Sequence, residues 1–208
     1  MHDLASYYLL LVTDDESGKA TAFTPQGLAG AVLAQMIIDG GIEVVERRLI
    51  AGLHRPVAEP YAGIWDLLNE EEKPRTASRW VGVLTSRRGA EARHAVAAKL
   101  ADEAGLRALL ESFGGTDLTS ATPETERTLR GDLLAMLAGP DDEIDDRTKV
   151  LVMLVVFSLA SQRVASDRSG RRQMSKRVAA WRKSGLLPEE LALVTEAVRV
   201  NVSDAASG

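Results

Sequence analysis

The chain has 208 residues, of which 45% are hydrophobic and 26% are charged, and it contains no cysteine. This length fits one domain with a sizeable core, and the composition excludes extensive disorder. The lack of cysteine excludes disulfides, thiolate metal sites and a cysteine nucleophile, and it suits the cytoplasm. A formal net charge of -5 opposes general attraction to nucleic acid or anionic lipid, so any anion recognition must come from a local basic patch.

Apolar residues at helical spacing predict four helices in the first part of the chain, with a small β-hairpin between the second and the third. The helices are expected at residues 4–11, 25–39, 61–69 and 77–85. Thr24 and Pro25 are typical of a helix start, and Gly40-Gly41 of a helix end. The hairpin is expected to pair residues 42–46 with an extended piece around Pro56, through a turn at Ala51-Gly52.

A second helix-and-hairpin unit is predicted at residues 91–103 and 106–115. A helix followed by a two-stranded wing is also the layout of winged-helix modules, so nucleic-acid binding stays open as an alternative. Neither predicted hairpin is basic overall, because acidic residues offset the nearby arginines. We therefore expect no nucleic-acid partner.

From Pro123 onward the pattern is purely helical, with helices expected at residues 123–137, 144–162, 173–184 and 188–200. The second of these is apolar nearly all round, but its apolar run of eleven residues, which includes Ser158, is shorter than the roughly 20 that span a membrane. Five acidic residues at 141–146 stand near its start, where they favour the helix macrodipole, so we interpret them as structural rather than metal-binding. The sequence predicts a mainly α, compact domain at residues 1–200 around a buried central helix, with one or two small hairpins and a tail at 201–208.

Residues suited to catalysis are few. Three histidines, His2, His54 and His94, lie far apart and none has a partner at metal-ligand spacing. Nucleophile-elbow, phosphate-loop and dinucleotide motifs are missing from the sequence. We therefore expect no enzyme activity, no metal and no cofactor.

The residues from 163 to 183 include eight basic residues and a single acidic one, Asp167. Arg168, Arg171 and Arg172 are expected to lie at or beside a loop at 166–170, where they could face an anionic membrane. The same charges could simply solubilise a helix pair, and both interpretations stay open. Arg127 and Arg130 form a second cationic pair, three residues apart on one helix face.

Several segments together resemble the Golgi phosphoprotein 3 family, and the chain is similar to a bacterial-type member. Residues 27–44 resemble the family's helix that begins Gly-Leu-x-Gly and leads into a strand. Residues 80–84, 146–154 and 175–178 resemble later family segments in the same order.

The resemblance implies binding of phosphatidylinositol 4-phosphate, because eukaryotic members are peripheral Golgi proteins that bind this lipid and retain glycosyltransferases. The implied pocket uses an aromatic residue and two arginines three apart, matched here by Phe23, Arg127 and Arg130. A third arginine of the family is replaced by Ala29. The family's apolar hairpin should fall near residues 164–174, which are polar and basic in this chain.

We therefore expect a cytoplasmic protein that binds anionic phospholipid head groups peripherally at the cytoplasmic face of a membrane. One alternative is a scaffold that binds a protein partner or itself without lipid. The other is the winged-helix nucleic-acid binder.

Overall fold

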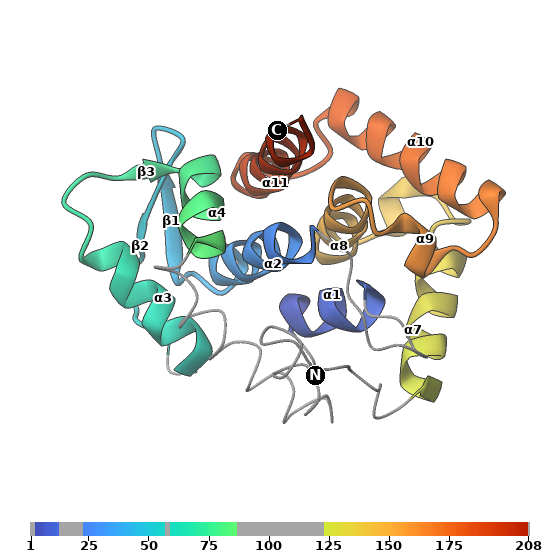
Figure 1. Ribbon diagram of the computed structural model, residues 1–208, viewed down its shortest axis with the longest axis horizontal. Coiled ribbons are helices and arrows are strands. Elements are labelled where there is room, and N and C mark those ends of the chain that lie inside the picture. Colours follow the sequence, from blue (N-terminus) through green and yellow to red (C-terminus); the bar gives the residue numbers. More distant parts are fainter. Residues whose placement is uncertain (1–2, 13–22, 57–58, 87–122, 208) are drawn as a thin grey trace.

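The computed structural model describes residues 3–12, 23–56, 59–86 and 123–207, which form a mainly helical domain with a small antiparallel sheet (Figure 1). This confirms the predicted fold class. The α-helices are α1 (Leu4–Val12), α2 (Thr24–Ile38), α3 (Glu59–Asn69), α4 (Ala77–Thr85), α7 (Pro123–Met136), α8 (Asp146–Phe157), α9 (Ser161–Val164), α10 (Arg168–Ser184) and α11 (Glu189–Ser207). The strands are β1 (Ile42–Val45), β2 (Arg48–Ala51) and β3 (Arg75–Thr76).

Helices α2 and α8 lie at the centre of the molecule, and each packs against both α1 and α11 (Figure 1). Every residue of α8 from Val150 to Val155 is buried, as its apolar sequence predicts. Gly30 lets α2 approach the neighbouring helices closely, because a Cβ there would lie 2.4 Å from Val198 Cγ2 and 2.8 Å from Leu154 Cδ2. The core thus joins helices from both ends of the chain.

A buried polar contact also links the two ends of the sequence. The Tyr8 hydroxyl of α1 donates a hydrogen bond to Ser158 Oγ, at 2.9 Å, directly after α8. Ser158 Oγ in turn donates to the Leu154 carbonyl at 2.7 Å. Burial raises the pKa of Tyr8 well above its usual value, so this hydroxyl stays protonated and available as a donor.

The sheet has the strand order β1-β2-β3, with Ile42 opposite Ala51 and Val45 opposite Arg48. The predicted turn at Ala51-Gly52 is wrong, because the chain reverses at Glu46 and Arg47, whose φ angles are 50° and 62°. A two-residue hairpin turn of type I′ needs positive φ at both positions, and the sequence signals it mainly when glycine or asparagine is present. β3 pairs with β2 and was not predicted.

The helices predicted in the first part are found at nearly the expected bounds, and 77–85 is α4 itself. Phe23 rather than Thr24 is the cap residue of α2, since Thr24 is already helical. The helix predicted at 91–103 and the hairpin at 106–115 lie outside the described residues.

The structure differs from four predictions for the C-terminal part. The central helix ends at Phe157 instead of 162, because Leu159 turns the chain with a φ of 59° before α9. Residues 164–174 are largely helical and contain no hairpin. The loop expected at 166–170 is shorter than predicted, because α10 already begins at Arg168. The boundary predicted after residue 200 falls inside α11, where Val202 is buried.

The acidic residues at 141–146 have the structural role that the sequence predicts. Asp145 caps α8 by accepting a hydrogen bond from the Thr148 backbone N–H at 2.7 Å. Asp141 accepts hydrogen bonds from side chains of α10, as described below. In the part of the chain that the structure describes, no group of three or more acidic, histidine or cysteine residues could hold a metal ion.

Candidate functional site

Helix α10 lies at the edge of the molecule and buries only one side (Figure 1). Asp167 caps its first turn by accepting a hydrogen bond from the Gly170 backbone N–H at 2.6 Å. Met174, Val178 and Trp181 form its buried side at the helical spacing of four and three residues. At about 1.5 Å per residue, its 17 residues extend about 25 Å along the molecular edge.

The opposite side of α10 carries a row of basic residues, which we call the cationic face: Arg168, Arg172, Lys176 and Lys183. All four are exposed, and their spacing of four, four and seven residues keeps them on one stripe of the helix. Helix α10 itself contains no Asp or Glu. Within the described ranges, none of the four forms an ion pair, so their charges are available to an external anion.

The inner side of α10 is fixed by polar contacts. Asp141 Oδ1 accepts hydrogen bonds from Arg177 at 2.5 Å and from Trp181 Nε1 at 2.7 Å. Arg177 also donates to the Gly139 carbonyl, and Gln173 Nε2 donates to the Leu137 carbonyl at 2.8 Å. These contacts hold the helix against the loop after α7 and turn the cationic face outward.

The three arginines predicted to face a membrane are divided by the structure. Arg168 and Arg172 are exposed on the cationic face, whereas Arg171 is half-buried. Arg171 Nη1 donates to the carbonyl oxygens of Ala165 and Ser166, at 3.1 and 2.6 Å. The sequence could not separate Arg171 from Arg172, but helical spacing from Arg168 would have found Lys176.

Phe23 caps the start of α2, and Arg127 and Arg130 lie on α7; both helices pack against α1. Phe23 is half-buried against the hydrophobic core, Arg127 is exposed and Arg130 is half-buried one turn further along α7. Ala29, which replaces the third arginine, is 1% exposed and faces the core. The shared pocket of Phe23, Arg127 and Arg130 stays a prediction.

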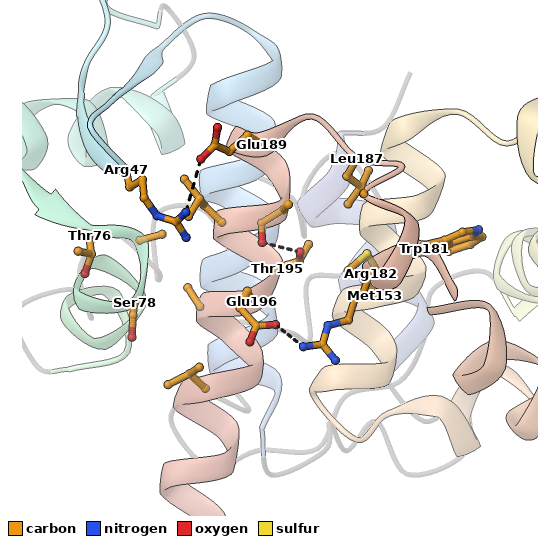
Figure 2. Close-up of a pocket in the computed structure, with 16 residues that line it drawn as sticks. Arg47, Thr76, Ser78, Met153, Trp181, Arg182, Leu187, Glu189, Thr195 and Glu196 are labelled. Atoms are coloured by element: carbon orange, nitrogen blue, oxygen red, sulfur yellow. Dashed lines mark hydrogen bonds and ion pairs between the residues drawn. The ribbon is translucent and has the colours of Figure 1, made fainter. Parts of the chain in front are cut away.

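A separate groove of about 590 Å³ runs beside α11 (Figure 2). Figure 2 shows Arg47 with Glu189 at one end and Arg182 with Glu196 toward the other, at N–O distances of 3.6 and 3.1 Å. A hydrogen bond from Arg199 and the charge of Arg182 lower the pKa of Glu196 against the opposing effect of burial. Because its arginines are paired with glutamates, this groove attracts anions less than the cationic face does.

The described residues contain no helix that is both long and apolar enough to cross a membrane. The family model for Golgi phosphoprotein 3 (GPP34) matches residues 4–205, nearly the whole chain. No curated protein matches the sequence.

Proposed function

Because the chain belongs to the Golgi phosphoprotein 3 family, we propose that it is a peripheral protein that binds anionic phospholipid head groups through the cationic face of α10. The observation that carries this proposal is the alignment of four exposed cations without ion pairs in the described residues, on the outer side of helix α10. Such a row is notable in a chain whose formal net charge is -5. Because this row of side chains points away from the core, it is accessible to a flat surface.

The expected strength of this attraction follows from simple electrostatics. Each basic residue near an anionic membrane surface contributes about 1 kcal/mol, and the contribution falls off within a Debye length. Four such residues would contribute about 4 kcal/mol, or roughly a thousandfold in affinity. Binding should therefore weaken steeply as salt is added.

Vesicle sedimentation tests the role of the cationic face. Replacing Arg172 and Lys176 by glutamine removes two charges, so binding to phosphatidylserine-containing vesicles is expected to fall roughly thirtyfold. The matched control neutralises two exposed cations elsewhere, Lys73→Gln with Arg79→Gln, and should bind nearly as well as the wild type. Equal losses in both double variants, or a wild type that ignores anionic vesicles, would contradict the proposal.

Selectivity for phosphatidylinositol 4-phosphate is the finer part of the proposal, and the family resemblance supports it. In this view, Phe23, Arg127 and Arg130 form the pocket that distinguishes the head group, while α10 supplies general attraction. The double variant Arg127→Ala/Arg130→Ala should lose the preference for vesicles with this lipid over phosphatidylserine vesicles of equal charge. An unchanged preference would remove the pocket assignment and leave the role of α10 intact.

The groove beside α11 favours a second candidate function, a protein-interaction scaffold. Its lining combines apolar side chains with two paired arginines, which suits a short peptide better than a phosphate group. Filling it with Ala192→Trp should abolish capture of a partner identified by crosslinking, while vesicle sedimentation stays unchanged. Loss of vesicle binding in this variant would instead place the groove within the lipid-binding surface.

A further inference from the structure

Leu159 combines two unfavourable features at the corner between α8 and α9. Its φ of 59° lies in the left-handed region, and 58% of its surface is exposed. A left-handed conformation is strained for a residue with a Cβ, and exposure of a leucine forgoes the gain of burial. Neither feature is explained by packing of the Leu159 side chain.

The same backbone arrangement ends two other helices, where glycine takes the left-handed position. After α8, the Ala160 N–H donates to the Val155 carbonyl at 2.9 Å, and the Leu159 N–H donates to the Val156 carbonyl at 3.2 Å. The corresponding left-handed residues after α2 and α10 are Gly40 and Gly185, with φ angles of 73° and 63°. Glycine is the expected residue here because it has no Cβ, so Leu159 is the exception.

We propose that the Leu159 side chain inserts into the interfacial region of an anionic membrane and acts as an apolar anchor beside the cationic face. This inference rests on the proposed function. It adds a hydrophobic contact to what would otherwise be a purely electrostatic attachment. A strained and exposed residue is then retained for the contact that its side chain makes with lipid.

The charges around this corner favour a lipid surface over another occupant. The sequence from Arg147 to Ser166 contains no Asp or Glu, so no carboxylate within it repels an anionic surface. Residues 163–172 contain Arg163, Arg168, Arg171 and Arg172 against Asp167 alone. One apolar side chain among basic residues suits a membrane interface, whereas a protein interface needs a much larger contact area.

The corner is also held close to the start of α10. Only eight residues separate Leu159 from Arg168, and four of them form the single turn of α9, which packs against α10. Arg171 fixes the remaining link by its hydrogen bonds to the Ala165 and Ser166 carbonyls. Leu159 and the N-terminal end of the cationic face can therefore act on the same membrane patch.

The variant Leu159→Gly should move stability and membrane binding in opposite directions. Glycine relieves the backbone strain, so the melting temperature is expected to rise by about 2–4 °C. Loss of the side chain should weaken binding to phosphatidylserine-containing vesicles roughly tenfold. The matched control is Leu53→Gly, which truncates a leucine that is 88% exposed in the loop after β2 and should leave vesicle binding unchanged.

A fluorescent label provides a direct readout, because the chain has no cysteine of its own. A nitrobenzoxadiazole group attached to Leu159→Cys should shift to the blue when anionic vesicles are added, and the same group at Leu53→Cys should not. If the wild type binds the vesicles but the label at position 159 shows no shift, this inference alone is overturned. The same holds if the wild type binds and Leu159→Gly binds equally well. Failure of the wild type to bind the vesicles overturns it together with the proposed function.

Discussion

Helices α8 and α10 show how one chain separates stability from surface chemistry. In α8 even Lys149 is only 7% exposed, and the apolar side chains contact neighbours on all sides. In α10 only Met174, Val178 and Trp181 are buried, and the four basic side chains of the cationic face point outward. Side chains of α8 are therefore constrained by packing, whereas the outer side of α10 can change with little effect on the fold.

The largest expected effect is in α8. Leu154 is fully buried between α2 and α11, so Leu154→Ala should lower the free energy of unfolding by about 2–5 kcal/mol. Lys176→Ala on the outer side of α10 should change it by less than about 0.5 kcal/mol. Urea unfolding measures both, and similar losses in the two variants would break the distinction between these helices.

The inner side of α10 should be intermediate. Asp141→Ala leaves Trp181 Nε1 and Arg177 without their shared acceptor, so we expect a loss of about 1–3 kcal/mol in unfolding free energy. Asp141→Asn keeps an oxygen that can accept from Trp181 and should cost less. If Asn and Ala were equally destabilising, the charge of Asp141 rather than its hydrogen bonds would explain the effect.

Two adjacent arginines of α10 differ in the same way as the two helices. Arg171 donates to two carbonyl oxygens, so Arg171→Ala should lower the unfolding free energy by about 1 kcal/mol. Arg172 forms no ion pair in the described residues, and Arg172→Ala should leave thermal unfolding almost unchanged. A destabilising Arg172→Ala variant would show that the cationic face also contributes to folding.

The smallest effect concerns the ion pairs of Glu196. Because the folded protein lowers the pKa of Glu196, its contribution is present above the pKa of the unfolded chain and is lost as pH falls through the folded value. At neutral pH, Glu196→Gln should cost only a few tenths of a kcal/mol, since the pair is partly exposed. The difference in melting temperature between wild type and variant should therefore shrink between pH 7 and pH 3.

Helical periodicity predicted most of the fold because each helix buries a recognisable apolar side. Two of the errors occur where non-glycine residues adopt positive φ. Glu46 and Arg47 form the hairpin turn, and Leu159 ends α8, although none of these residues is typical of such positions. In all three, the residue type does not signal the left-handed backbone, so a single sequence does not reveal these turns.

The candidate site could be predicted only in part, because the sequence did not show where α10 begins. Charge density alone identified residues 163–183 but could not say which arginines face outward. Once the helix is known to begin at Arg168, spacing separates Arg172 and Lys176 from the inward Arg177. The inward orientation of Arg171 depends on carbonyl groups at Ala165 and Ser166 that no pattern in the sequence marks.

The position of α11 has a consequence for synthesis of the protein. This last helix packs against α2, α4 and α8, and Asn201 donates a hydrogen bond to the Ser78 carbonyl at 3.1 Å. A ribosome must therefore release α11 before α2 and α8 can obtain this neighbour. Until then the nascent chain exposes apolar helices, so its completion is expected to depend on protection by chaperones.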